Sequence, residues 1–342
     1  MNTVEIHCSE HYQVIIGNGV IQNIDIILRQ ITKAEKVCIV SDSNVWPLYG
    51  GVVCGFLKNF QVCSCVFPAG EESKRVENYL SLLNFLAGNH MTRSDCIIAL
   101  GGGVVGDLAG FAAATYLRGI PYIQVPTTLL AMVDSSVGGK TGIDLESGKN
   151  LVGAFHQPAA VLCDTDMLRT LPLNIFRDGC AEVIKYGILY DAELFSHLES
   201  SGLEFDREFV ITRCIEMKRN AVAADEFDQG QRKLLNLGHT VGHAIEKCSE
   251  YRISHGKAVA IGMATVCRAA NFQDTRRIVD LLEKFDLPVK TNYTAAELSS
   301  VAHSDKKRNG SSIDLIVPCA IGHCQIVPTP IDELQAFIEK GL

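Results

Sequence analysis

Short apolar runs rich in β-branched residues alternate with helix-period segments along the first half of the chain. The runs that predict strands cover residues 12–16, 36–40, 61–67, 96–100, 122–125 and 160–163. Between them, apolar positions at helical spacing predict helices, including 76–86 and 104–116. Continuous apolar strands that alternate with helices predict a parallel sheet covered on both faces.

The pattern changes near Pro172, after which helical segments follow one another. They cover residues 177–189, 192–200, 207–224, 234–249, 257–271 and 276–285. A late hairpin is predicted from strands at 313–317 and 324–327. We therefore expect an α/β fold with two domains: an α/β domain over 1–171 and a mainly α-helical domain over 172–342. A cleft between two such domains is a common place for a ligand.

Composition narrows the class of protein. The chain has 342 residues, of which 47% are apolar, so a large core is possible and general disorder is excluded. It carries 39 acidic and 31 basic side chains, a net charge of −8, which argues against a nucleic-acid partner. A local basic cluster could still bind an anionic substrate.

The thirteen cysteines include no Cys-x-x-Cys pair, and Met1–His7 lacks the pattern of a secretory signal. We therefore expect reduced thiols and a cytoplasmic protein. Residues 96–117 are apolar enough to resemble a membrane span, with Asp107 as the one charge. Their five glycines favour a strand, a turn and a helix instead, so we expect no membrane association.

A glycine-rich turn, Gly101 to Asp107, follows a predicted strand and opens a predicted helix. Such a turn lets backbone N–H groups approach a pyrophosphate, although it can also serve only as a tight turn. Asp42, at the end of an earlier strand, could accept hydrogen bonds from a ribose diol or could cap the next helix.

A second polar, glycine-rich loop covers 133–142. It contains Gly-Lys-Thr but lacks the upstream glycine of an ATP-binding P-loop. With Lys149 and Asn150 shortly after it, Asp134 and Lys140 could hold a phosphorylated, hydroxylated molecule. A solvated surface loop is the alternative.

Histidines and a carboxylate suggest a metal site in the second half. His239 and His243 lie four residues apart, on one helix face, and His255 follows further on. Glu182 lies upstream, three residues before Lys185. A single histidine is usually structural, but one carboxylate with two or three histidines would suit a divalent metal ion with an open position.

Taken together, these motifs make the chain resemble the 3-dehydroquinate synthase family of sugar phosphate cyclases. The resemblance follows the family's order over nearly the whole chain. It rests on residues 70–74, 101–107, 116–119, 126–130, 133–142, 148–155, 181–185, 235–239 and 255–256.

The resemblance implies NAD and one divalent metal ion, zinc or cobalt, as cofactors. It makes the first domain a Rossmann-like nucleotide-binding domain and the second a metal- and substrate-binding domain. It implies a lyase of the shikimate pathway, in aromatic amino acid biosynthesis, that converts 3-deoxy-D-arabino-heptulosonate 7-phosphate to 3-dehydroquinate and phosphate. The steps are transient oxidation, β-elimination, reduction and intramolecular aldol closure. A homodimer is also implied.

The resemblance also assigns residues to roles. The metal ligands are Glu182, His239 and His255, which leaves His243 for the substrate, whereas spacing alone pairs His239 with His243. The NAD-binding residues are Asp42, Glu71, Lys74, Gly103, Val104, Val105, Gly106, Asp107, Thr127, Thr128, Asp134, Lys140, Lys149 and Thr170.

Substrate and catalytic roles are implied in the same way. Lys218 and Arg232 suit the substrate carboxylate, since arginine offers a planar fork for it. Lys185 belongs to the catalytic set. The phosphate pocket is expected from Lys140, Asn150, Asn236, His243 and either Lys306 or Lys307, with Arg118 from a partner subunit.

Two positions depart from the family pattern, Asp228 and Lys257, where glutamate is usual in both places. The alternatives are a related cyclase that makes 2-deoxy-scyllo-inosose or a valiolone, and a metal-dependent dehydrogenase of the glycerol dehydrogenase type. A catalytically dead NAD- or metal-binding regulator is a third.

Overall fold

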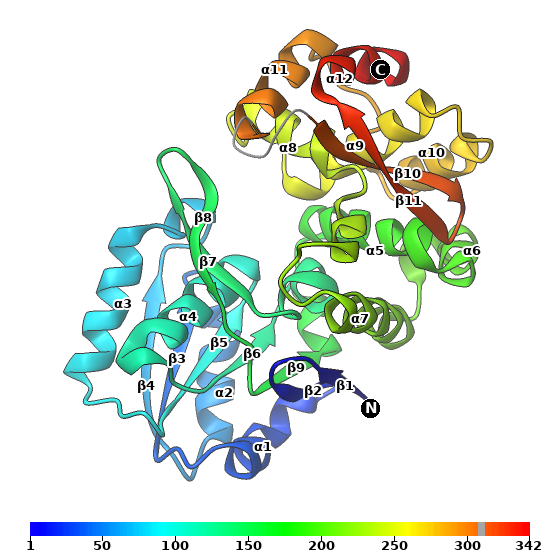
Figure 1. Cartoon of the computed structure of the whole chain (residues 1–342). Helices are drawn as coiled ribbons and strands as arrows, with labels where there is room; N and C mark the ends of the chain where they lie inside the picture. The colour runs from blue at the N-terminus through cyan, green and yellow to red at the C-terminus, as the bar shows by residue number, and fades with distance from the viewer. Residues whose placement is uncertain (307–311) are drawn as a thin grey trace. The chain divides into compact units, whose positions relative to one another are not determined.

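The structure is a computed structural model that describes residues 1–306 and 312–342, and the side chains of 303–306 are not considered. The chain forms two compact units. The first comprises Met1–Leu171 and Arg207–Phe227, and the second comprises Pro172–Asp206 and Asp228–Leu342. Figure 1 follows the chain through both.

A seven-stranded sheet is the centre of the first unit, and it contains the six predicted strands together with one that was not predicted, at Asn2–His7. Its order is β1-β2-β9-β6-β5-β3-β4, with β1 antiparallel to β2 and the other neighbours parallel. The strands are β1 (Asn2–His7), β2 (His11–Gly17), β3 (Lys36–Asp42), β4 (Gln61–Phe67), β5 (Cys96–Gly101), β6 (Tyr122–Pro126) and β9 (Ala160–Asp164).

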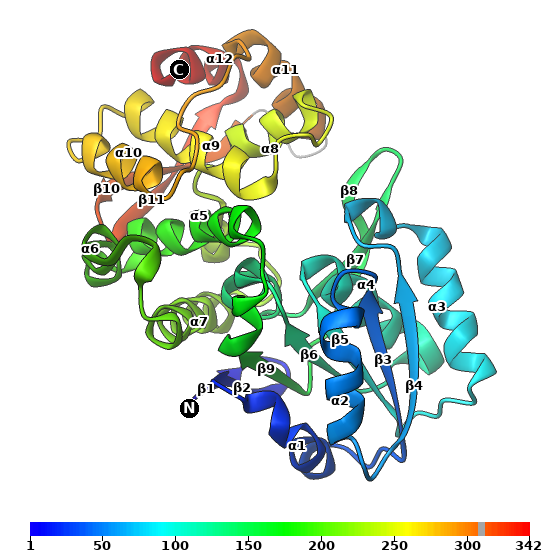
Figure 2. The same ribbon diagram turned by 180° about the vertical axis from the view of Figure 1, so that it is seen from behind.

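Helices cover both faces of this sheet, with α4 on one face and α2 on the other (Figures 1 and 2). Val105 and Leu108 of α4 pack in one core with Ile97 of β5. The apolar stretch 96–117 is thus a strand followed by a helix, and no helix in the described residues is long and apolar enough to cross a membrane. The helices are α1 (Ile24–Ile31), α2 (Gly51–Phe56), α3 (Val76–Gly88) and α4 (Gly103–Thr115).

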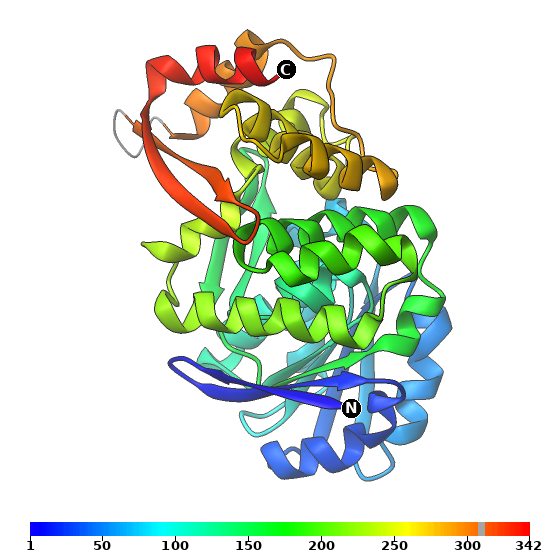
Figure 3. The ribbon, with the colours of Figure 1, turned by 90° about the vertical axis from the view of Figure 1, so that its right-hand side faces the viewer.

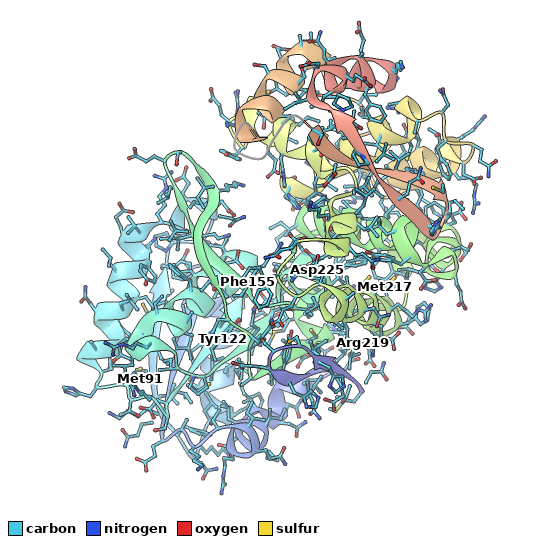
Figure 4. All side chains as sticks on the ribbon, viewed as in Figure 1. Met91, Tyr122, Phe155, Met217, Arg219 and Asp225 are labelled. Atoms are coloured by element: carbon cyan, nitrogen blue, oxygen red, sulfur yellow. The ribbon has the colours of Figure 1, made fainter. Side chains whose placement is uncertain are left out.

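Residues 140–155 form a hairpin, whereas the sequence predicts a polar loop at its start. Strands β7 (Lys140–Leu145) and β8 (Gly148–Phe155) pair antiparallel. Most β8 side chains are exposed or half-buried, so no clear apolar alternation marks the strand. At its end, Phe155 packs edge-to-face on Phe227 at 5.2 Å between ring centroids (Figure 4).

The helix α7 (Arg207–Ala224) groups with the first unit, although the sequence predicts it within a domain of 172–342. The helix runs beside the β1–β2 hairpin (Figure 3). Just beyond it, Glu226 accepts a 2.6 Å hydrogen bond from Ser9 Oγ. Val210 and Cys214 are fully buried. The helical period predicts this helix well but does not identify the sheet that it covers.

The second unit is mainly helical, as expected, and includes the predicted late hairpin. Ile245 of α8 and Ile261 of α9 share a core with Leu315 of the hairpin and Ile338 of the last helix. Its elements are α5 (Leu173–Tyr190), α6 (Ala192–Ser201), α8 (His239–Cys248), α9 (His255–Ala269), α10 (Thr275–Lys284), α11 (Ala295–Lys306), β10 (Ser312–Ala320), β11 (His323–Pro330) and α12 (Leu334–Gly341).

Candidate functional site

In the second unit, α8 and α9 each begin at a histidine, and glycines allow the two helices to approach closely. Gly238 precedes α8 with a left-handed φ of 77°. A Cβ atom on Gly262 would lie 2.0 Å from the Gly238 carbonyl oxygen. This close packing brings the His239 and His255 rings to 5.2 Å between centroids, although they lie sixteen positions apart.

Glu182 of α5 lies beside both imidazoles and is fully buried. Its Oε1 atom is 3.6 Å from His239 Nε2 and 3.3 Å from His255 Nε2. Its Oε2 atom contacts the ammonium group of Lys185, one helical turn further along. Ligand atoms of the carboxylate and the two histidines all lie within 4.8 Å of one another.

In both His239 and His255, the Nδ1 atom makes a hydrogen bond. His239 Nδ1 donates to the Leu237 carbonyl oxygen at 3.0 Å, and His255 Nδ1 donates to Glu246 Oε2 at 3.3 Å. Since Nδ1 is the donor in both rings, Nε2 is the atom offered to a metal ion. Two imidazoles and one carboxylate form a donor set that fits zinc or cobalt.

The two rings differ in their proton affinity. Burial, reinforced by the charge of Lys185, lowers the pKa of His239 well below its usual value. Burial also disfavours the charged form of His255, but hydrogen bonds to Glu182 and Glu246 outweigh it and raise its pKa to about 10. A metal ion at Nε2 would therefore displace a proton from His255.

His243 lies one turn beyond His239 and is exposed. Its ring centroid is 5.2 Å from that of His239 and 6.1 Å from that of His255. It does not belong to the group around Glu182, although it forms a second close group with Glu246 and His255. Glu246 was missed by the sequence analysis. Its position seven residues after His239, on the same helix face, is the signal that could have found it.

Arg232 and Asn236 lie on a turn, Gln231–Asn236, just before α8. The arginine is 2% exposed, whereas the asparagine is exposed. Between them, Lys233 Nζ donates to Asp314 Oδ2 at 2.9 Å and links the turn to β10. The turn therefore places both side chains within the same unit as the histidines.

In the first unit, the glycine turn opens α4 at the carboxyl end of β5. A Cβ atom on Gly106 would lie 2.5 Å from Gln124 Oε1, so α4 approaches β6 closely at this glycine. Thr127, at the end of β6, has a buried Oγ1 atom without a hydrogen-bond partner in the part of the chain that the structure describes. A helix N-terminus beside a buried hydroxyl is a fitting cradle for a pyrophosphate.

Charged residues gather beside this turn. Lys74 Nζ lies 2.5 Å from Asp107 Oδ2 and also contacts Asn150 Oδ1, while Lys149 Nζ lies 3.9 Å from Glu71 Oε1. Burial alone would lower the pKa of Lys74, but Asp107 and Glu71 outweigh it and raise the pKa. Burial raises the pKa of Glu71, against the opposing effect of the two lysines.

Asp144 is a further residue of this cluster that the sequence analysis missed. Its Oδ1 atom accepts a 2.7 Å hydrogen bond from the Asn150 N–H, which holds Asn150 at a positive φ of 56°. Its own N–H donates to the Lys74 carbonyl oxygen at 2.7 Å. Asp144 thereby fixes the hairpin to the segment that carries Lys74.

Three other predicted NAD contacts have local partners. Asp42 Oδ1 accepts from the N–H groups of Asn44 and Val45, in the turn that precedes the helix beginning at Trp46. Thr128 Oγ1 accepts from Ala131 N–H at 3.2 Å. Thr170 Oγ1 lies 2.5 Å from Tyr49 Oη.

Some of the predicted residues are exposed or lie outside the described residues. Arg118 is exposed and lies just after the end of α4. The glycine turn lies at the start of this helix, which is about 20 Å long. Lys140 is exposed at the start of β7. The Lys306 side chain and all of Lys307 lie outside the described residues.

Known structures share this fold. A 2-deoxy-scyllo-inosose synthase complexed with carbaglucose-6-phosphate, NAD⁺ and Co²⁺ matches with a TM-score of 0.89 and 26% identity, covering 100% of both chains. ValA, a 2-epi-5-epi-valiolone synthase from Streptomyces hygroscopicus with NAD⁺ and Zn²⁺ bound, matches with a TM-score of 0.88 and 26% identity over 98% of each chain. These similarities define the fold as that of a sugar phosphate cyclase.

Sequence comparison identifies the family. The profile for the N-terminal region of 3-dehydroquinate synthases matches residues 64–178, and the profile for the C-terminal region matches 179–308. The 3-dehydroquinate synthase of Enterococcus faecalis is 43% identical, over 96% of both chains. The chain belongs to the 3-dehydroquinate synthase family.

Proposed function

We propose that the protein converts 3-deoxy-D-arabino-heptulosonate 7-phosphate to 3-dehydroquinate and phosphate. The observation that carries the proposal is the buried Glu182 carboxylate beside the Nε2 atoms of His239 and His255. The family membership of the whole chain then indicates which reaction such a site serves. Phosphate elimination makes the enzyme a carbon–oxygen lyase.

Glu182, His239 and His255 hold the metal ion, and residues around the glycine turn hold NAD. Bound NAD supplies reversible hydride transfer, and the bound metal ion supplies Lewis-acid activation of a hydroxyl. In the first unit the turn at Gly103–Asp107, with Thr127, fits the pyrophosphate. Lys74 and Glu71 stand beside that turn and fit the adenosine end.

The remaining side chains bind and orient the substrate. Arg232 offers a planar pair of donors to the substrate carboxylate, together with Lys218. Lys140 and Asn150 bind the phosphate, with Asn236 and His243 as further contacts. The ammonium of Lys185 contacts Glu182 Oε2 and helps to orient that carboxylate. Most of the catalytic effect is then positioning and charge stabilisation.

A related cyclase remains a second candidate because the match to 2-deoxy-scyllo-inosose synthase has a TM-score of 0.89. The 43% identity to a 3-dehydroquinate synthase, against 26% to that enzyme, favours the dehydroquinate product. Turnover of glucose 6-phosphate without turnover of the heptulosonate would reverse the preference. Net accumulation of NADH would instead indicate a dehydrogenase of the glycerol dehydrogenase type.

The decisive experiment measures phosphate release from the heptulosonate with catalytic NAD and zinc, before and after chelation. Chelator-sensitive release with formation of dehydroquinate and no net NADH supports the proposal. Absence of release with zinc, cobalt or any other divalent metal contradicts it.

The proposal includes a homodimer in which Arg118 reaches the phosphate pocket of the partner subunit. Support comes from the position of Arg118, about the length of α4 away from the glycine turn of its own chain. We also propose a cytoplasmic location, supported by the thirteen cysteines, all of which lie in described residues and are free thiols.

A further inference from the structure

Glu246 contacts His255, a proposed metal ligand, on the side of the ring that faces away from Glu182. It lies in the last part of α8 with a side chain that is 6% exposed. Its Oε2 atom accepts a hydrogen bond from His255 Nδ1 at 3.3 Å. The opposite nitrogen of the same ring, Nε2, lies 3.3 Å from Glu182 Oε1. The His255 imidazole thus lies between two buried carboxylates.

We infer that Glu246 is the positioning residue for His255 and sets the metal affinity of the site. A carboxylate at Nδ1 fixes the tautomer and the plane of the ring, and it makes Nε2 a stronger donor. His239 has only a neutral partner of this kind in the described residues, the Leu237 carbonyl oxygen. Glu246 therefore gives one of the two histidines a charged support. The inference rests on the proposed metal site.

Hydrogen bonds close the two helix ends that carry Glu246 and His255. The Glu246 carbonyl oxygen accepts hydrogen bonds from Tyr251 N–H at 2.7 Å and Ser249 Oγ at 2.9 Å, which close the end of α8. On the other side, Asp178 Oδ1 accepts from Ser254 Oγ and from the Lys257 N–H at the start of α9. Both helix ends are thus held by hydrogen bonds, and these ends carry Glu246 and His255.

Glu246 also lies near His243, and these two residues with His255 have ligand atoms within 4.8 Å of one another. A second metal ion at this group is the competing interpretation. In that case Glu246 would itself be a ligand, and the protein would bind two ions. Metal stoichiometry separates the two interpretations.

The test compares metal binding by the full chain and its Glu246→Gln, Glu246→Ala and Glu250→Gln variants. Zinc affinity is measured by competition with a chromogenic chelator, and the cobalt-loaded proteins give a visible absorption spectrum that reports ligand geometry. Gln retains an acceptor for Nδ1–H, whereas Ala removes it. Glu250→Gln removes an exposed charge only four residues away and is the matched control.

We expect one zinc ion per chain, with affinity about 10- to 100-fold weaker in Glu246→Ala and a smaller loss in Glu246→Gln. The cobalt spectrum should change in Glu246→Ala, while Glu250→Gln keeps the wild-type affinity and spectrum. Circular dichroism of the metal-free proteins checks that each variant is folded. If Glu246→Ala is unfolded, the comparison of zinc affinity rests on Glu246→Gln.

Wild-type affinity in both Glu246 variants, or two zinc ions per chain, would overturn the inference. If the unmodified protein binds no zinc, both the proposed metal site and the role of Glu246 are wrong. If it binds one ion but releases no phosphate from the heptulosonate, the proposed reaction fails while the role of Glu246 is still decided by the titration.

Discussion

Lys218 Nζ donates a 2.7 Å hydrogen bond to Asp134 Oδ1. The lysine comes from α7 and is largely buried, and the aspartate lies in the turn that leads to β7. The family resemblance assigns Lys218 to the substrate carboxylate and Asp134 to NAD. The ion pair therefore links a proposed substrate contact to a proposed NAD contact within the first unit. Each side chain helps to orient the other.

Replacing Asp134 tests this connection. Asp134→Ala leaves a buried ammonium without this acceptor, so the free energy of unfolding should fall by about 1–3 kcal/mol. Asp134→Asn keeps an acceptor oxygen for Lys218 and should lose less. Urea unfolding at pH 7 measures both variants. An unchanged free energy of unfolding in Asp134→Ala would show that the ion pair does not stabilise the first unit.

His239→Ala should abolish activity because the metal site loses one of three ligands. The fold should survive, since the ring is not part of the apolar core shared by α8 and α9. Metal content after dialysis checks the loss of zinc, and circular dichroism checks that the fold survives. His323→Ala, on β11 of the same unit, is the control and should keep its zinc. Full zinc occupancy in His239→Ala would exclude this histidine as a ligand.

Gly256→Ala should displace the start of α9, which carries His255. The added Cβ atom would lie 1.9 Å from the Asp178 carbonyl oxygen, and a backbone atom cannot move aside easily. We expect a loss of about 1–3 kcal/mol in stability and weaker zinc binding. Gly55→Ala, where nothing lies within 4 Å of the new atom, should be neutral or slightly stabilising. Similar results for both substitutions would count against the steric argument.

Local patterns predict the buried elements better than the contacts between them. The strand predicted at 96–100 is β5, and the helix predicted at 207–224 is α7, because each has a continuous apolar run or face. The β8 strand was missed because most of its side chains are not buried. The pairing of α7 with β1 and β2 depends on residues about 200 positions apart, which no local period records.

The metal site shows the same limit. Spacing favours His239 with His243, since residues four apart share a helix face. The structure instead places His255 beside Glu182, because Gly238 and Gly262 let a different helix approach. The family resemblance supplied this ligand set, whereas local spacing could not. Glu246 and Asp144 act through other residues, so neither belongs to a motif with its own chemical signature.

Arg118 and Lys140 allow a test of the proposed dimer. Arg118→Ala and Lys140→Ala should each be nearly inactive when purified alone. If Arg118 serves the partner's site, mixing the two variants after subunit exchange creates dimers with one intact site. About a quarter of the wild-type rate should then return. No recovery despite proven exchange would place Arg118 outside the partner's site, and a monomer in solution would exclude the arrangement altogether.

Asp95 should make the first unit sensitive to acid. Its carboxylate accepts hydrogen bonds from Thr92 N–H at 2.7 Å, Thr92 Oγ1 at 2.8 Å and Lys36 N–H at 2.9 Å. Burial opposes the charge, but these hydrogen bonds outweigh it and lower the pKa of Asp95. The folded state therefore favours the ionised form. Its contribution is fully present above the pKa of the unfolded chain, about 3.9, and is lost as pH falls through the lower folded value.

Asp95→Asn should consequently lower the free energy of unfolding at pH 7 by about 1–2 kcal/mol. The gap between variant and wild type should narrow as pH falls from about 4 to 3, because the wild-type carboxylate then takes up its proton. Urea unfolding across this range measures the gap, with Asp332→Asn, an exposed carboxylate, as the control that should show none. A gap that stays constant down to pH 3 would mean that the charge of Asp95 contributes nothing and that only the shape of its side chain matters.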